Sequence, residues 1–206
     1  IERVSPENGS VITGAQLFTV TASDNKAVKS ITLEYALGQE EEWQAALTAA
    51  GEEAEFVLDT TQFEEETIRI RFLAEDIYGN QAYSDVVLEY RIDNQGPEQV
   101  KNLACTVTSS TITLSWDDVA DEDFSYFQVE QRLEDGTWKE IQKVYTTKGT
   151  NITGLLPGQE MVYRVTAYDI YGNRGISSEE IAAETEADTT DPRVTGITPE
   201  AKRCRG

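Results

Sequence analysis

Hydrophobic and polar residues alternate with a period of two along most of the chain. In the clearest segment, Ile68, Ile70 and Phe72 fall on one side and Arg69 and Arg71 on the other. Such alternation is typical of a β-strand with one buried and one solvated face. Seven strand-like segments are expected between residues 4 and 93. The other apolar stripes are Phe18, Val20 and Ala22; Ile31, Leu33 and Tyr35; Phe56 and Leu58; and Val86, Leu88, Tyr90 and Ile92.

Residues 41–50 allow two interpretations. Glu, Gln, Ala and Leu are good helix formers, which favours a helix. The segment is short, however, and it lies between two expected hairpin partners. We therefore predict a strand here, with Trp43 capping the core after a turn at residues 37–39.

One heptapeptide, Ala-x-Asp-Ile-Tyr-Gly-Asn, occurs twice, at residues 74–80 and 167–173. Each copy follows an alternating stretch, and an Asp-x-x-Gly-Asn turn after a strand predicts a hairpin. The copies are 93 residues apart, close to the roughly 100 residues of one β-sandwich. The sequence therefore predicts an all-β chain of two antiparallel sandwiches in tandem. The expected limits are 1–94 and 95–187, followed by a linker and a truncated strand at 188–206.

The second half contains four motifs: Val-Lys-Asn-Leu at 100–103, Ile-Thr-Leu-Ser-Trp at 112–116, Ile-Thr-Gly-Leu-Leu-Pro-Gly at 152–158 and Tyr-Arg-Val-Thr-Ala at 163–167. Together they resemble a fibronectin type III domain over about residues 97–186. The resemblance implies that Trp116 packs in the core and that the Pro-Gly segment leads into the sixth strand. Met161 stands where that family usually has Tyr, so the corner hydrogen bond of that hydroxyl is not expected here.

The first half resembles the immunoglobulin-like modules of large bacterial surface proteins. The resemblance rests on residues 20–25, 33–35 and 58–61, on Trp43 and on the first heptapeptide. Residues 194–200 also repeat the aliphatic, hydroxyl, Pro and Glu pattern of residues 1–7. We therefore expect the opening strand of a third, immunoglobulin-like module, in a longer parent that alternates the two kinds.

Composition excludes several classes of function. The 206 residues contain no His, which rules out Ser-His-Asp and Cys-His nucleophile systems and imidazole-ligated zinc. A net charge of −21 argues against nucleic acid and anionic membrane surfaces. No apolar run approaches the ~18 residues that a membrane span needs. The sequence has no signal peptide and no initial Met, so we expect a piece of a longer protein.

Acidic residues in turns are the first candidate site. In a sandwich of this topology, one end of the second domain is expected to gather the candidate ligands Asp93, Asp117, Asp118, Asp121 and Asp169, with Asp123 beside them. Oxygen ligands gathered there could hold calcium. Turn chemistry alone also favours Asp at such positions, because its side chain bonds the local backbone. Both alternatives stay open, and no other cofactor is indicated.

Aromatic residues are the second candidate. Tyr78 and Tyr171 occupy equivalent hairpin tips, and Trp138 lies on a predicted strand. Aromatic side chains at such places can contact a glycan or a protein. The alternative is that the tyrosines fold back over the ends of the sandwiches. Cys105 is expected to be a buried free thiol, and no partner within the chain is predicted for Cys204.

These observations predict a protein without catalytic activity. We expect spacer or interaction modules of a large bacterial cell-surface or secreted protein, whose partners are neighbouring modules of its own chain and possible protein or glycan ligands. The alternative is a set of accessory modules in a secreted carbohydrate-active enzyme. The expected location is extracellular or at the cell surface, without insertion into the membrane by this segment.

Overall fold

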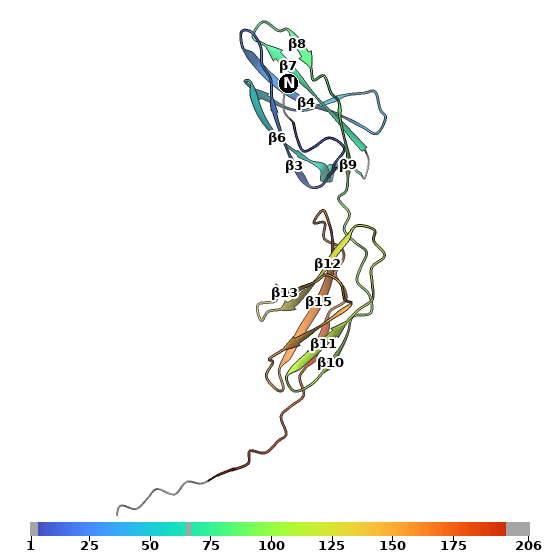
Figure 1. Ribbon diagram of the computed structural model, residues 1–206, viewed down its shortest axis with the longest axis vertical. Helices are drawn as coiled ribbons and strands as arrows, with labels where there is room; N and C mark the ends of the chain where they lie inside the picture. Colours follow the sequence, from blue (N-terminus) through green and yellow to red (C-terminus); the bar gives the residue numbers. More distant parts are fainter. Residues whose placement is uncertain (1–3, 65–66, 197–206) are drawn as a thin grey trace, which may run out of the picture. The chain divides into compact units, whose positions relative to one another are not determined.

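A computed structural model describes residues 4–64 and 67–196, and this part of the chain is all-β (Figure 1). One 3-10 turn, η1 (Thr60–Gln62), accompanies the strands, and the described residues contain no α-helix. Two compact units are present. The first holds Ile1–Gln99 with Val119–Phe127 and Thr166–Ser177, and the second holds Val100–Asp118, Gln128–Val165 and the residues from Ser178 onward. The predicted all-β class is confirmed.

Two facing sheets form the sandwich of the first unit, in the orders β1-β3-β6 and β2-β9-β7-β4-β5, with β8 paired to β7. Its core lies between them, where Phe18 packs edge-on against Tyr90 with ring centroids 5.6 Å apart. The Tyr90 hydroxyl donates to the carbonyl of Pro6 at 2.8 Å, and burial raises the pKa of Tyr90 to about 12. The strands are β1 (Val4–Ser5), β2 (Val11–Ile12), β3 (Ala15–Thr21), β4 (Val28–Leu37), β5 (Gln44–Ala50), β6 (Glu53–Asp59), β7 (Thr67–Asp76), β8 (Gln81–Tyr83) and β9 (Leu88–Ile92).

The opening strand is divided between the two sheets. β1 pairs antiparallel with β3, whereas β2 crosses to the other sheet and pairs parallel with β9. Pro6, which has no N–H, lies just after β1, and Gly9 has a φ of 84° that favours glycine. These two residues allow the chain to change sheets. The purely antiparallel arrangement expected from the sequence is therefore wrong at β2–β9.

β5 is a strand, as predicted, and not a helix. It pairs with β4 from Ser30↔Ala50 to Tyr35↔Gln44, with a bulge at Leu33/Glu34. Trp43, immediately before β5, does not cap the core. Its ring lies 4.2 Å from the guanidinium carbon of Arg71, a residue of β7 whose neighbours Ile70 and Phe72 point into the core. The side chain of Trp43 therefore belongs to the outer face of this sheet.

The second sandwich also has two sheets, in the orders β10-β11-β14 and β13-β12-β15-β16. Trp116 is buried, as the resemblance implies. The Tyr163 hydroxyl donates to the sulfur of Met161 at 3.1 Å, so the residue that replaces the usual Tyr still takes part in a buried contact. The strands are β10 (Ala104–Val107), β11 (Thr111–Ser115), β12 (Phe124–Arg132), β13 (Trp138–Val144), β14 (Gly149–Thr153), β15 (Glu160–Asp169) and β16 (Ile181–Glu184).

The borders of the units differ from the expected domain limits. The turn regions 119–127 and 166–177 group with the first unit, and Gly96 lies against one of them: a Cβ on Gly96 would be 2.3 Å from the carbonyl carbon of Arg174. The limits at residues 94 and 187 stay a prediction. No regular structure occurs from 185 to 196, and the proposed strand and Cys204 in 197–206 lie outside the described residues. Cys105 is half-buried rather than fully buried as expected.

Candidate functional site

Both copies of the heptapeptide form the same hydrogen-bonded turn. At the end of β15, one oxygen of Asp169 accepts the N–H groups of Tyr171 (2.9 Å) and Asn173 (2.8 Å). The other oxygen accepts the Asn173 side-chain amide at 2.8 Å. Gly172 supplies the left-handed backbone, with a φ of 90°. Asp76 at the end of β7 receives the equivalent three bonds from Tyr78 and Asn80.

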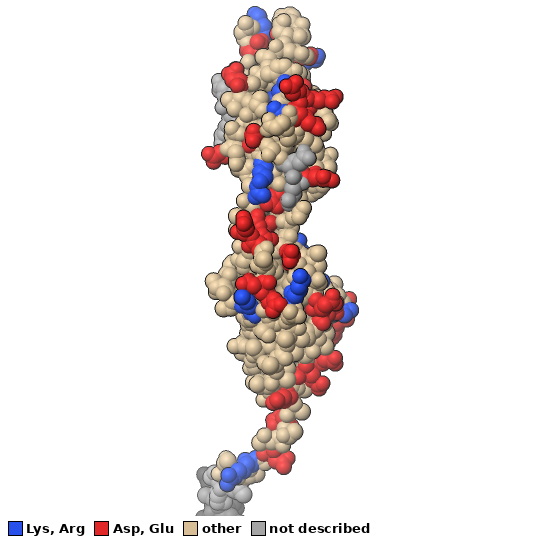
Figure 2. Space-filling view, turned by 90° about the vertical axis from the view of Figure 1, so that its right-hand side faces the viewer, with Lys and Arg blue, Asp and Glu red and all other residues tan. Residues whose placement is uncertain are grey.

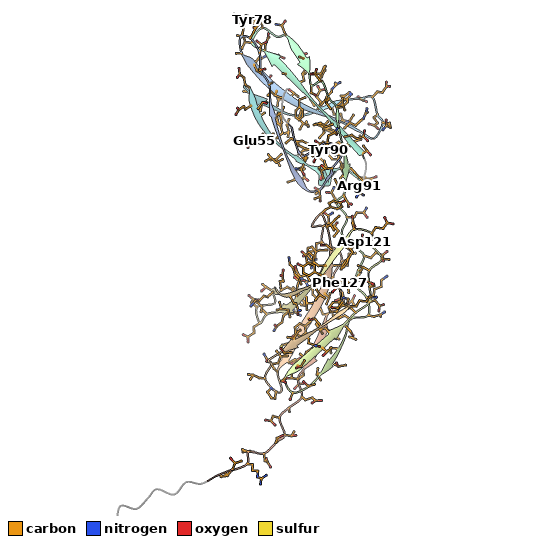
Figure 3. All side chains as sticks on the ribbon, viewed as in Figure 1. Glu55, Tyr78, Tyr90, Arg91, Asp121 and Phe127 are labelled. Atoms are coloured by element: carbon orange, nitrogen blue, oxygen red, sulfur yellow. The ribbon has the colours of Figure 1, made fainter. Side chains whose placement is uncertain are left out.

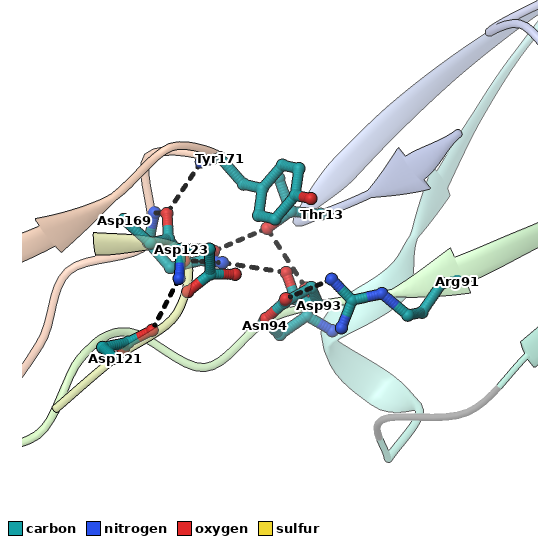
Figure 4. Close-up of polar contacts among 9 residues, drawn as sticks. Thr13, Arg91, Asp93, Asn94, Asp121, Asp123, Asp169 and Tyr171 are labelled. Atoms are coloured by element: carbon teal, nitrogen blue, oxygen red, sulfur yellow. Dashed lines mark hydrogen bonds and ion pairs between the residues drawn. The ribbon is translucent and has the colours of Figure 1, made fainter. Parts of the chain in front are cut away.

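Three carboxylates meet at the Asp169 turn, and we call them the Asp93 cluster: Asp93, Asp123 and Asp169. A carboxylate oxygen of each lies within 4.8 Å of the others (Figure 4). Asp93 follows β9, Asp123 precedes β12 and Asp169 ends β15, and all three belong to the first unit. Asp93 is 6% exposed and Asp169 is 2% exposed. This concentration of buried negative charge requires nearby donors.

Arg91 is a cation beside the cluster. Its Nη2 lies 3.1 Å from Oδ2 of Asp93, and its guanidinium carbon lies 5.9 Å from the ring centroid of Tyr171 (Figure 4). The pKa of Arg91 is raised, first by a hydrogen bond with Tyr171 and also by the charges of Asp93 and Asp123. Arg91 therefore compensates part of the negative charge of the cluster.

A network of uncharged groups surrounds the same turn. The hydroxyl of Thr13 donates to Oδ1 of Asn173 at 2.6 Å, and the Asn173 amide donates to the backbone oxygen of Asp93 at 2.9 Å. Oδ1 of Asn94 accepts the N–H of Gly14 at 2.9 Å and the hydroxyl of Thr60 at 3.0 Å. We call this the Asn173 network. It links segments that are up to 160 residues apart in the sequence.

The structure brings together only part of the predicted acidic site. Asp93 and Asp169 meet, and Asp121 lies close by, since its carboxylate accepts the N–H of Asp123 at 3.2 Å. A hydrogen bond with the side chain of Asp123, together with burial, raises the pKa of Asp121. Asp117 instead accepts the Asn102 amide at 2.7 Å, and Asp118 pairs with Lys148 at 2.9 Å.

Asp123 was expected at this end of the domain but was not among the predicted ligands, although it belongs to the cluster. The sequence signal that could have included it is its position two residues after Asp121, on the way into β12. Asp117 and Asp118 lie outside the cluster. Both belong to the second unit, where Asn102 donates to Asp117 and Lys148 pairs with Asp118.

Carboxylate oxygens of the Asp93 cluster could act as calcium ligands. Both oxygens of Asp169, however, already accept N–H groups of its own turn, as those of Asp76 do at the other hairpin. Turn chemistry therefore accounts for Asp169 without a metal, and calcium binding stays a hypothesis.

The three predicted aromatic contacts have different surroundings. Tyr78 is 71% exposed at the tip of the β7–β8 hairpin (Figure 3). Tyr171 packs against Arg91, as described above. Trp138 stacks on Arg164, whose guanidinium carbon lies 4.2 Å from the ring centroid. Ligand contact through these residues stays a prediction, and Tyr78 is the one with most of its side chain open to solvent.

A second repeated arrangement was not predicted from the sequence. On one sheet of each sandwich, a Trp ring stacks on an Arg that pairs with a half-buried or buried Glu. The two sets are Trp43, Arg71 and Glu34, and Trp138, Arg164 and Glu130. The two arginines have the same spacing as the two heptapeptides, which is the signal that could have revealed them. Because each guanidinium is engaged on its face and at its edge, these sets stabilise the sheets rather than offering free cations.

Acidic side chains are abundant on the surface. Figure 2 shows Asp and Glu spread over the face drawn there, with fewer Lys and Arg among them. This distribution follows from the 38 acidic and 17 basic residues of the sequence. No helix in the described part of the chain is both long and apolar enough to span a membrane.

Comparison with known families gives a match for the second sandwich. Residues 97–184 match the sequence profile of the fibronectin type III domain. This match supports a fibronectin type III domain in that part of the chain. A segment of 102 residues is 35% identical to the receptor-type tyrosine-protein phosphatase F of Bos taurus, and covers 47% of this chain and 5% of that protein. The chain thus corresponds to a small part of that relative's length.

Solved structures show the same architecture. The FN1-FN3 domains of chicken CNTN1 align with a TM-score of 0.61 and 16% identity, over 87% of this chain and 66% of theirs. Domains A168-A170 of titin align with a TM-score of 0.51 and 12% identity, over 86% of this chain and 62% of theirs. At these identities the likeness concerns the fold. It supports the all-β fibronectin type III fold.

Proposed function

We propose that this chain is a spacer and interaction segment of a larger protein that is secreted or displayed at the cell surface, without catalytic activity of its own. The observation that carries the proposal is the fibronectin type III match in a chain whose described strands all build β-sandwiches. Such domains typically act as non-catalytic modules in extracellular and receptor proteins, and the phosphatase relative is named a receptor.

The arrangement of the Asp93 cluster supports a structural role. Asp169 is bound to the backbone of its own turn and Asp93 pairs with Arg91. A carboxylate that serves as a general base must reach a substrate proton, which these buried and occupied groups are poorly placed to do. A bacterial parent is the prediction from the first-half resemblance, whereas the phosphatase relative is from Bos taurus and the aligned CNTN1 domains are from chicken.

Stretching the full chain between two handles by single-molecule force spectroscopy tests the spacer role. Two unfolding steps of about 30 nm each are expected, because some 90 residues extend to roughly 3.6 Å apiece. A single unfolding step, or extension without force peaks, would contradict the proposal. Hydrolytic activity of the chain on model ester, phosphate or glycoside substrates would contradict its non-catalytic part.

The second candidate function is an accessory, glycan-contacting segment of a carbohydrate-active enzyme. The exposure of Tyr78 at a hairpin tip favours it, because aromatic rings stack on sugar faces. A glycan array probed with the wild-type chain and with Tyr78→Ala separates the two proposals. Binding that Tyr78→Ala abolishes supports the accessory role, and equal, background signals from both proteins leave the spacer role.

A further inference from the structure

β5 is an edge strand of the first sandwich, and its outer edge has no partner in the described part of the chain. Among the described edge strands it is the longest without a charged residue, with the sequence Gln-Ala-Ala-Leu-Thr-Ala-Ala. Other edge strands are short or charged. β10, β14 and β16 have four or five residues, β6 carries Glu53, Glu55 and Asp59, and β13 carries Lys139, Glu140 and Lys143. Proteins commonly guard exposed edges in these ways, so the unguarded β5 is an exception.

The pairing with β4 shows which groups of β5 point outward. The N–H of Gly51 donates to the carbonyl of Lys29 at 3.1 Å, immediately beyond the pair Ser30↔Ala50. Bonded and non-bonded pairs alternate in an antiparallel ladder. The backbone groups of Ala50 and Thr48 therefore face away from β4. The register is regular from Leu47 to Ala50, because the bulge lies nearer Gln44.

Side chains along this edge suit a neighbouring strand. Leu47 is 36% exposed, although it pairs with the fully buried Leu33 and so lies at the rim of the core. Ala49 also packs against the core. A strand added beside β5 would cover Leu47 and meet only small side chains elsewhere, so no bulky group blocks its approach.

Negative charge brackets the edge at both ends. Exposed Glu40, Glu41 and Glu42 precede β5, and exposed Glu52 and Glu53 follow it. The strand between them is uncharged. A partner that matches this pattern carries Lys or Arg at both ends of a short uncharged segment.

We propose that β5 is a docking edge that binds an extended segment of a partner protein, with basic residues flanking about four uncharged, β-forming residues. The segment adds a strand to the sheet through the outward backbone groups of Thr48 and Ala50, and an apolar side chain covers Leu47. This inference rests on the interaction role proposed above and names the class of partner that the chain would bind.

A second copy of this chain fits the edge poorly. Antiparallel pairing of two β5 strands places Glu40, Glu41 and Glu42 of one copy beside Glu52 and Glu53 of the other. Each copy also carries a net charge of −21. Like charges at close range oppose such a dimer, so the heterologous basic segment is the favoured occupant.

The test titrates the full ¹⁵N-labelled chain with the peptide acetyl-Lys-Arg-Val-Thr-Val-Thr-Arg-Lys-amide. We expect saturable amide shifts centred on Thr48 and Ala50, and slower hydrogen exchange at both. Two further peptides carry N-methyl groups on alternate residues, in opposite frames. One frame should weaken binding at least about tenfold and the other should not, because only one face of the peptide bonds β5.

Charge variants complete the test. The double variant Glu52→Lys/Glu53→Lys should bind the basic peptide at least about tenfold more weakly. Its matched control is Glu184→Lys/Glu186→Lys, which changes the net charge equally on exposed residues at the end of the second sandwich. Equal loss in both variants, equal loss in both N-methyl frames, or shifts away from β5 would overturn the proposal. Protection of Thr48 that grows with protein concentration in the absence of peptide would replace the basic segment with a second copy.

The failure of this inference can be told from the failure of the proposed function. If the chain does not bind the peptide but still unfolds in two steps under force, the docking edge is contradicted and the spacer role is supported.

Discussion

The two Asp-Ile-Tyr-Gly-Asn turns have the same sequence and the same internal hydrogen bonds, but their surroundings differ. Asp76 and Tyr78 form a hairpin open to solvent, with Tyr78 71% exposed. Asp169 is 2% exposed, and its turn carries the Asn173 network and the Asp93 cluster. The comparison shows that the local sequence determines the turn, whereas the neighbours determine what the turn contributes to stability.

The largest difference is expected when each Asp is removed. Asp169→Ala leaves the N–H groups of Tyr171 and Asn173 without their acceptor in a buried setting, which costs roughly 2–4 kcal/mol. Asp76→Ala removes the same bonds where water can replace them, so its cost should be clearly smaller. Urea unfolding of both variants, followed by Trp fluorescence, measures the difference. Equal losses would mean that the surroundings of the Asp169 turn contribute nothing.

A smaller difference is expected for the two Asn residues. Asn173→Ala removes the acceptor of the Thr13 hydroxyl and the donor to the backbone oxygen of Asp93, at a cost of about 1–3 kcal/mol. Asn80→Ala loses only the bond to Asp76 and should cost less than half as much. The matched pair is compared by differential scanning calorimetry. Hydrogen exchange at Gly14 should rise only in Asn173→Ala, and a similar rise in Asn80→Ala would contradict the assignment of the Asn173 network.

The sequence was sufficient to predict the turns but not their surroundings. Alternation and the repeated heptapeptide predict both hairpins and the strand character of β5, because these depend on neighbours in the sequence. The parallel β2–β9 pairing and the outer position of Trp43 depend on where distant strands lie. The acidic site was predicted in part for the same reason: Asp93 and Asp169 meet, whereas Lys148 and Asn102 hold Asp118 and Asp117 elsewhere.

Lowering the pH should weaken the contribution of Asp76 to folding stability and strengthen that of Asp121. The hydrogen bond from the Asn80 side chain holds the pKa of Asp76 below its ordinary value of 3.8, although burial opposes this. Its contribution is therefore present above pH 3.8 and is lost as the pH falls through the lowered value. The pKa of Asp121 is raised by its hydrogen bond with Asp123, so its contribution is full below pH 3.8 and is lost as the pH rises through the raised value.

Carboxyl-carbon NMR titration between pH 2 and 6 measures both groups. Asp76 should titrate at lower pH than Asp121, and Asn80→Ala should move only Asp76 upward. Asp123→Asn should bring Asp121 back toward its ordinary value, because it removes the partner that raises it. Overlapping titration curves in the wild-type chain would show that the two regions do not differ in this respect.

The smallest effect is expected from calcium, which tests the remaining alternative for the Asp93 cluster. Asp169 uses both oxygens within its turn and Asp93 pairs with Arg91, so we expect the same Tm in millimolar calcium and in chelator. A cation bound only by the folded chain would raise the Tm by mass action. Asp123→Ala is the informative variant, because it removes a member of the cluster while leaving the Asp169 turn intact, and Asp118→Ala, in the second unit, is its matched control. A calcium-dependent rise that Asp123→Ala abolishes and Asp118→Ala keeps would establish a metal site, and would make the two turns differ in chemistry as well as in burial.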